Sequence, residues 1–162
     1  MKVNGKRDIG TFLISIIITE GTGYLSSVLT RGSQNIYNTL KRPWFSPPPW
    51  VFPIVWIVLF FLMGLALYRI VMLQKQGEDV KKPITLFTIQ LVLNFLWPIL
   101  FFRLRLIGLA FFELIILIIF ILLTTVSFYK KDKIAGYLFI PYLLWSMYGA
   151  VLNYFIWSLN NM

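Results

Sequence analysis

The chain of 162 residues is 59% hydrophobic and 18% aromatic but only 13% charged, a composition that excludes an ordinary soluble domain. It has no cysteine and no histidine, so a disulfide framework, a zinc cluster and a catalytic cysteine–histidine pair are excluded. The net charge of +9 comes from basic residues in short clusters between apolar segments, as membrane-flanking charges do, and we expect no nucleic-acid partner, no metal and no cofactor.

Five apolar segments are long enough to cross a bilayer, which needs about 20 predominantly apolar residues. We expect a single all-α domain over residues 1–162, an integral membrane protein built as a bundle of five transmembrane helices. The expected helices cover residues 9–29, 50–73, 83–102, 106–128 and 134–157. The first could also be a signal peptide, since Lys2, Lys6 and Arg7 precede it, but Glu20 interrupts its apolar run and no small-residue cleavage motif follows.

The basic residues favour one orientation in the membrane. The side that holds the N-terminus carries ten of them: Lys2, Lys6, Arg7, Arg69, Lys75, Lys81, Lys82, Lys130, Lys131 and Lys133. The other side carries Arg31, Lys41, Arg42, Arg103 and Arg105. The positive-inside rule then predicts a cytoplasmic N-terminus and a C-terminus outside.

Residues 30–49 form the one long connection between the expected helices. Within it Ile36, Tyr37 and Leu40 lie at helical spacing after Ser33, a residue type that favours N-caps, which predicts a short helix over the end of the bundle. We therefore expect this long first loop to act as a lid.

Three consecutive prolines, Pro47 to Pro49, close this loop. Proline donates no backbone hydrogen bond and restricts the residue before it to extended conformations, so the run predicts a stiff, non-helical joint. The second transmembrane helix then begins at or near Pro49 or Trp50, with Pro53 tolerated in its first turn.

Three of the expected helices carry a stripe of aromatic residues mixed with an amide or a small residue. The stripes are Phe52, Trp56, Phe60 and Met63; Gln90, Asn94, Trp97 and Phe101; and Tyr142, Trp145, Gly149 and Asn153. An amide in lipid is costly unless it faces the interior, so stripes that share one interior would line a cavity for a large planar or polycyclic apolar ligand. The alternative is ordinary membrane packing, with aromatic rings at the interfaces and amides joining helices.

Three further residues keep two interpretations each. Gly149 either allows close helix packing or leaves room for a ligand or a partner subunit. Glu20 and Glu113 stand inside apolar segments, where an acid indicates a proton relay or a ligand contact by default. The alternatives are an ion pair of Glu113 with Arg103 or Arg105, and hydrogen bonding or protonation of Glu20.

Three stretches, in order along the chain, carry a family resemblance. The first contains Lys41, Arg42, Pro43, Phe45, Pro47, Pro48, Trp50, Phe52, Val55, Trp56 and Leu59. The second contains Gln90, Leu91, Leu93, Asn94, Trp97, Pro98, Phe101 and Phe102, and the third contains Pro141, Tyr142, Leu143, Trp145, Leu152 and Asn153. By these residues the chain resembles the translocator protein family, also called TspO, tryptophan-rich sensory proteins or peripheral benzodiazepine receptors.

The resemblance implies a five-helix bundle in a bacterial cell membrane, commonly a homodimer, that binds porphyrins, sterols and benzodiazepine-type drugs under its first loop. It places Trp56, Asn94, Trp97 and Trp145 in the cavity wall. Together with the stripes it gives these candidate ligand-binding residues: Tyr37, Pro47, Trp50, Phe52, Trp56, Phe60, Asn94, Trp97, Phe101, Trp145 and Gly149.

Departures from the family pattern narrow the range of expected ligands. Phe45 and Phe60 stand where many relatives have tryptophan and tyrosine, so a hydroxyl contact is lost at Phe60. The sterol motif proposed for animal members needs a basic residue soon after a tyrosine, and residues 155–162 contain none. We therefore expect a porphyrin or haem-like tetrapyrrole as the partner in preference to a sterol-like lipid, with membrane lipid around the bundle.

Binding is the favoured function, as a sensor or transporter. The first alternative is a light-dependent porphyrin-degrading enzyme, for which the resemblance implicates Trp56 and Trp145. The absence of a general-base arrangement speaks against it, since His and Cys are missing and both membrane acids are isolated. The second alternative is an accessory subunit without a small ligand.

Overall fold

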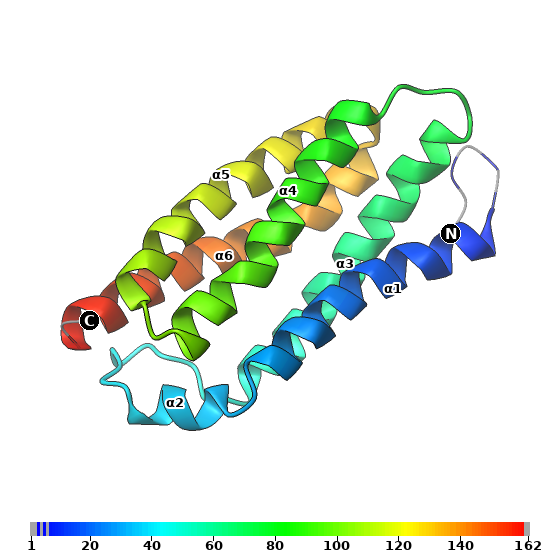
Figure 1. The fold of residues 1–162 in the computed structure, drawn as a ribbon. Coiled ribbons are helices and arrows are strands. Elements are labelled where there is room, and N and C mark those ends of the chain that lie inside the picture. Colours follow the sequence, from blue (N-terminus) through cyan, green and yellow to red (C-terminus); the bar gives the residue numbers. More distant parts are fainter. Residues whose placement is uncertain (1–2, 4, 6, 161–162) are drawn as a thin grey trace.

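Five long apolar helices run side by side, and a short helix crosses one end of the bundle in the computed structural model (Figure 1). The structure describes residues 3, 5 and 7–160, so Lys2, Lys6 and Met162 lie outside the described residues. The long helices are α1 (Ile9–Leu29), α3 (Val51–Gln74), α4 (Lys81–Pro98), α5 (Ile107–Lys131) and α6 (Lys133–Asn160). Each is long and apolar enough to span a bilayer, which confirms the predicted five-helix membrane bundle.

The connection between α1 and α3 contains the predicted short helix, α2 (Ser33–Thr39). The predicted cap was wrong, because the N-cap is Gly32, whose φ of 84° is left-handed, and Ser33 already lies inside the helix. Helix α3 begins at Val51, and Pro53 lies in its first turn as predicted.

The third transmembrane segment is not one uniform helix. Pro98 has no N–H to donate, and after it the chain widens into a π-helical turn, η1 (Ile99–Arg103), in which the Leu104 N–H donates to the Ile99 carbonyl at 2.9 Å. The wide turn directs Phe101 and Phe102 toward the interior, where both side chains line a cavity.

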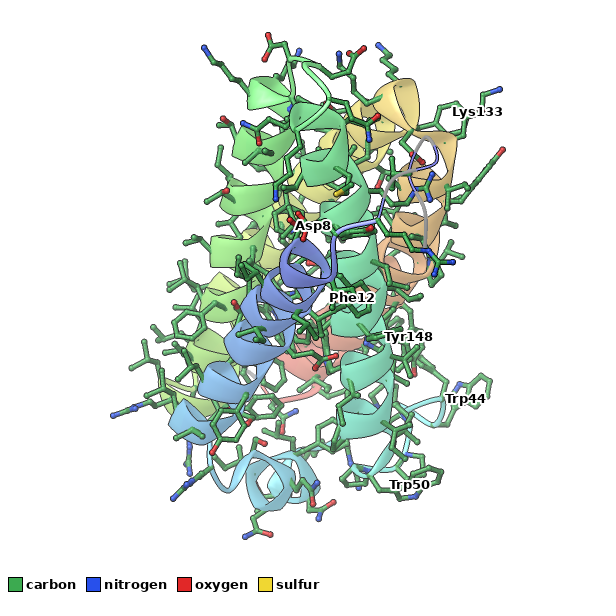
Figure 2. All side chains as sticks on the ribbon, turned by 90° about the vertical axis from the view of Figure 1, so that its right-hand side faces the viewer. Asp8, Phe12, Trp44, Trp50, Lys133 and Tyr148 are labelled. Carbon is green, nitrogen blue, oxygen red and sulfur yellow. The ribbon has the colours of Figure 1, made fainter. Side chains whose placement is uncertain are left out.

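Helix α3 supplies much of the buried core, and α1 and α6 pack along it. Helix α5 packs between α4 and α6. Small residues set the close approaches: a Cβ on Gly64 would lie 2.7 Å from Thr19 Oγ1 of α1, and one on Gly136 would lie 2.7 Å from the Tyr129 Cα of α5. The outward faces carry isoleucine, leucine and phenylalanine side chains, as a surface in contact with lipid requires (Figure 2).

Ion pairs gather at the end of the bundle that holds the N-terminus. Arg69 of α3 binds Asp132 through two hydrogen bonds of 2.9 and 2.6 Å, and both side chains are about nine-tenths buried. Burial raises the pKa of Asp132, but the hydrogen bonds from Arg69 and from the Ala135 N–H outweigh it, so that this pKa lies below its ordinary value. The pair ties α3 to the turn between α5 and α6.

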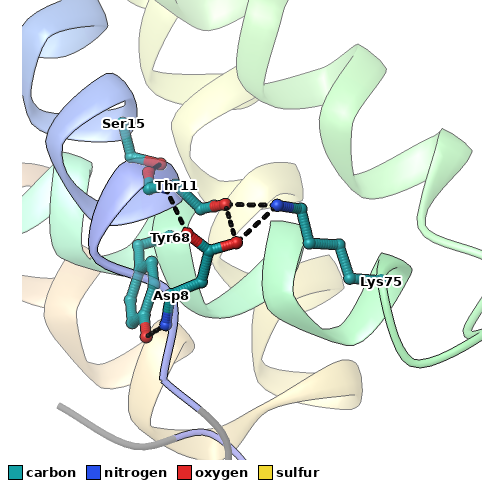
Figure 3. Close-up of polar contacts among 5 residues, drawn as sticks. All are labelled: Asp8, Thr11, Ser15, Tyr68 and Lys75. Carbon is teal, nitrogen blue, oxygen red and sulfur yellow. Dashed lines mark hydrogen bonds and ion pairs between the residues drawn. The ribbon is translucent and has the colours of Figure 1, made fainter.

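A second polar cluster ties α1 to the end of α3 (Figure 3). Asp8 caps α1 by accepting from the Thr11 N–H at 2.9 Å, and Lys75 donates to both the Asp8 carboxylate and the Thr11 hydroxyl at 2.6 Å. The bonds from Lys75 and Thr11 hold the pKa of Asp8 well below its ordinary range.

Candidate ligand-binding site

Two chambers lie side by side within the bundle, toward the end that α2 crosses, and they share a wall of mostly aromatic side chains. The shared wall consists of Tyr37, Phe52, Trp56, Asn94, Trp97 and Phe102, drawn from α2, α3, α4 and η1. Space free of protein atoms, including the mouth, amounts to about 610 Å³ in one chamber and about 840 Å³ in the other. Aromatic side chains therefore separate the two chambers.

The smaller space, here called the α6 chamber, extends from the shared wall toward α5 and α6. Its own lining is Phe101, Leu114, Leu117, Trp145, Ser146, Tyr148, Gly149, Leu152, Asn153 and Ile156. The Trp145 ring meets Phe52 edge to face, with the ring centres 6.1 Å apart. The chamber is thus lined by aliphatic and aromatic groups and by few polar ones.

The larger space, here called the α1 chamber, extends from the shared wall toward α1 and α2. Its own lining is Gly23, Ser26, Ser27, Thr30, Ser33, Gln34, Pro49, Pro53, Phe60 and Pro98. Gly23 allows α1 to approach here, because a Cβ at this position would lie 2.5 Å from the Phe60 ring. One side of this chamber is aromatic and the other carries hydroxyl groups.

A buried hydrogen-bond network fixes the polar part of the shared wall. The Asn94 side-chain amide donates to the Tyr142 hydroxyl at 2.7 Å, and that hydroxyl donates to the Gln90 side-chain oxygen Oε1 at 3.0 Å. None of the described residues donates a hydrogen bond to the side-chain oxygen of Asn94. Because Asn94 lines both chambers, this oxygen is available to accept a hydrogen bond from a ligand. Trp97 is held as well, because its indole N–H donates to Asn153 at 3.1 Å.

The first connection lies over the chambers and is held by its own contacts. The Tyr37 hydroxyl donates to the Pro47 carbonyl at 3.3 Å, and its ring packs edge to face on Phe52. The Tyr148 hydroxyl of α6 donates to the Phe45 carbonyl at 3.0 Å. These contacts join α2, the proline run and α6 into one cover.

The predicted site residues divide into two groups by position. Tyr37, Phe52, Trp56, Phe60, Asn94, Trp97, Phe101, Trp145 and Gly149 line one chamber or both. Pro47 and Trp50 line neither: Pro47 contributes its carbonyl to Tyr37, and Trp50 points away from the bundle with 63% of its surface exposed (Figure 2).

The structure favours one interpretation of Gly149. A Cβ there would have only one neighbour, Leu114 Cδ2 at 3.9 Å, which is ordinary van der Waals contact. The position is therefore not a tight helix crossing like Gly136, and its missing side chain opens the α6 chamber.

The two membrane acids have no basic partner among the described residues. Glu113 is buried, and neither of its carboxylate oxygens has a hydrogen-bond partner there, so the ion pair with Arg103 or Arg105 does not form. Arg103 instead donates to the Leu29 carbonyl at 3.4 Å. Neither Glu20 nor Glu113 lines a chamber.

Sequence reasoning missed the hydroxyl side of the α1 chamber. The sequence signal was weak, since Thr11, Ser15 and Thr19 recur every four residues on one buried face of α1 but none of them lines the chamber. The described residues form no cluster of three acidic residues that could hold a metal.

Fold and chambers together define a class: a small multi-pass membrane protein with an aromatic-walled cavity under a helical cover. The comparisons identify its family. A sequence model described as the TspO/MBR family matches residues 14–158, and the chain belongs to that family.

Named relatives agree with this assignment. The chain is similar to the tryptophan-rich protein TspO of Archaeoglobus fulgidus, with 40% identity over 90% of this chain and 94% of the relative. It is similar to the protein of the same name from Chlorobaculum tepidum, with 36% identity over 95% and 98%. It is also similar to the human translocator protein, with 36% identity over 77% and 75%.

Proposed function

We propose that the protein is a membrane-embedded binding protein, a sensor or transporter, for porphyrins or other large flat apolar ligands, and that it also binds benzodiazepine-type drugs. The observation that carries the proposal is the shared wall, in which rings from four elements line two adjoining pockets. Large flat apolar surfaces gain most by burial against such rings, and a single amide such as Asn94 is enough to orient them.

Binding is favoured over catalysis by the residues that face the chambers. Among the described residues, neither lining contains a carboxylate, lysine or arginine side chain, so the chambers lack the paired charged groups that most acid–base catalysis uses. Light-dependent degradation of the porphyrin needs no such group, and both Trp56 and Trp145 face the α6 chamber, where they could exchange electrons with an excited ligand.

Absorbance spectroscopy with protoporphyrin IX tests the proposal and separates the two activities. Purified protein is titrated in darkness and then illuminated. A saturable shifted spectrum that persists in light supports binding alone, and light-dependent loss with a new product band supports degradation. No saturable change in absorbance or tryptophan fluorescence would refute the proposal and favour an accessory subunit.

We propose further that the protein lies in a bacterial cell membrane as a homodimer with its N-terminus in the cytoplasm. Lys81, Lys82, Lys130 and Lys133 gather at that end of the bundle, with α2 and Asn160 at the other. A reporter inserted near Gly77 should then read as cytoplasmic and one fused to the C-terminus as external, and the reverse pattern would overturn the orientation. The dimer rests on the family resemblance, and the mass of the detergent-solubilised protein tests it.

A further inference from the structure

Glu20 lies in the middle of a membrane span without a partner. It stands near the centre of the 21-residue helix α1, about 14 Å from the nearer helix end at the usual rise per residue. None of the described residues forms an ion pair or a hydrogen bond with its carboxyl group. A glutamate side chain is too short to reach the headgroups from that depth, and an acid in lipid is costly unless something pairs with it.

Helix α1 is the least enclosed of the five spans. It packs against α3, α4 and η1 and lies at the edge of the bundle (Figure 1). In its apolar 18-residue window 17% of the residues are buried, against 28–39% in the other four spans. The side of α1 that faces away from α3 is therefore open to a further helix.

This open side carries a regular row of residues. Leu13, Ile17, Glu20 and Tyr24 follow one another at intervals of four, three and four, the alternation with which two paired helices meet along a seam. Leu13, Ile17 and Tyr24 are 51%, 67% and 68% exposed, and Glu20 is partly exposed between them. We call these four residues, together with the neighbouring Gly21, the α1 seam.

Gly21 is not explained by packing within one chain. A Cβ at this position would have no atom within 4 Å, whereas one on Gly23 would meet the Phe60 ring at 2.5 Å. Gly23 is thus needed for the contact with α3 and Gly21 is not. A small residue on the open face of a membrane helix allows the backbone of another helix to come close. Two adjacent residues, the acid and the glycine, therefore indicate a helix partner at the same place.

The chemistry of the α1 seam fits a second copy of itself. The apolar span of α1 contains no basic residue, and a protonated carboxyl group both donates and accepts a hydrogen bond, so it is complementary to another carboxyl group. Two copies inserted in the same orientation are related by a two-fold axis along the membrane normal. Such an axis beside α1 brings Glu20 of each copy to the same depth.

We propose, on the basis of the homodimer proposed above, that the α1 seam is the dimer interface and that the two Glu20 side chains hydrogen-bond to each other at its centre. Gly21 gives the backbones room to approach, and Ile17 and Tyr24 pack above and below the acid pair. The opposite side of α1 lines the α1 chamber through Gly23 and Ser26, so the interface leaves the chamber lining free.

Disulfide cross-linking in lipid vesicles tests where the copies meet. The chain has no cysteine of its own, so each introduced cysteine is the only one present. Ile17→Cys and Tyr24→Cys should give covalent dimers on oxidation. Ile18→Cys and Leu25→Cys are the matched controls, because Ile18 and Leu25 are also exposed, at 45% and 57%, but lie on another side of the same helix. Cross-links at the control positions and none at the seam would overturn the proposal, even if the protein is a dimer.

A second experiment tests what holds the copies together. Fluorescence energy transfer between labelled copies in vesicles gives the dimer dissociation constant. Glu20→Leu removes the hydrogen bonds and Gly21→Leu blocks the close approach, and each should weaken the dimer about tenfold. Glu20→Gln keeps a donor and an acceptor and should stay near the parent. Parental dimerisation in both leucine variants would overturn the proposal.

The two proposals fail separately. A parent protein that is monomeric in vesicles would refute the homodimer and this interface with it. Glu20→Leu should bind protoporphyrin IX like the parent, since Glu20 lines neither chamber. A parent that dimerises through the α1 seam without binding porphyrin would refute the proposed ligand and support the interface.

Discussion

At the scale of single residues, the tryptophans of this chain differ in what surrounds them. Trp145 lines the α6 chamber and meets Phe52, whereas Trp44 projects from the first connection with 96% of its surface exposed (Figure 2). Residue type alone does not distinguish them. Their positions do, and the pair provides an internal control.

Replacing Trp145 by alanine should weaken porphyrin binding by about 1–3 kcal/mol, because it removes an aromatic wall from the α6 chamber. Fluorescence titration measures the affinity, and circular dichroism shows that the helices remain. Trp44→Ala should bind like the parent. An unchanged affinity in folded Trp145→Ala would place this ring outside the ligand contact.

The sequence predicted a lining residue correctly where two signals, helical spacing and a family motif, pointed to the same position. Phe52, Trp56 and Asn94 carried both helical spacing and a family motif, and all three line the shared wall. Trp50 carried the motif alone and is exposed at the bundle end. Ser26 carried neither, because a serine in a membrane helix usually bonds to its own backbone, and only the structure shows that this one does not.

At the scale of elements, the proline run joins the cover to α3. The Pro48 carbonyl accepts from the Val51 N–H at 3.0 Å, and Pro49 lines the α1 chamber. The Tyr37 hydroxyl donates to the Pro47 carbonyl, so α2 is linked to the run directly. A stiff run should make the cover move as one body over the chambers.

Replacing Pro47, Pro48 and Pro49 together by alanine should therefore speed porphyrin release more than it slows uptake. Alanine has more backbone freedom, so the open state of the cover gains entropy. Stopped-flow fluorescence measures both rates. Pro43→Ala, a proline of the same connection outside the run, is the control and should release ligand at the parental rate. Equal release from the triple variant and the parent would show that the run only starts α3.

The positions of the long helices could be predicted from hydropathy, but the interruptions within them could not. A single apolar segment was expected over residues 83–102, whereas the chain is α-helical to Pro98 and π-helical over Ile99–Arg103. A proline in a membrane helix is compatible with a straight, kinked or widened helix, since neighbouring helices can satisfy the freed carbonyl groups. In this chain the widened turn packs against α5, α2 and α1, which hydropathy does not encode.

At the scale of the whole molecule, the five spans could be predicted but not which face of each meets lipid. On α3, Ile57 is 61% exposed and Ile70 is fully buried, although both are the same residue type on one helix. Lipid and protein core are equally apolar, so hydropathy carries little periodic signal. The helices are oriented by features of another kind, such as the glycine approaches and the ion pairs at the bundle end.

The Arg69–Asp132 ion pair connects the parts of the bundle that hydropathy leaves unconnected, because it joins α3 to the turn between α5 and α6. The folded-state pKa of Asp132 lies below its ordinary value of 3.8. The stability that the pair contributes is therefore fully present above about pH 4 and is lost as the pH falls through the lower folded-state pKa.

Asp132→Asn should consequently lower the thermal midpoint at pH 7 and flatten the loss of stability in acid. The cost is about 3 kcal/mol, since Arg69 would be left buried without its counter-charge. Unfolding in detergent, followed by circular dichroism at several pH values between 7 and 3, measures both effects. Asp79→Asn changes an exposed acid at the same end of the bundle and is the control. Asparagine can keep the hydrogen bond from the Lys81 N–H at 3.0 Å, so the midpoint should stay at the parental value. A parental acid profile in Asp132→Asn would mean that other carboxylates, and not this pair, hold the bundle together in acid.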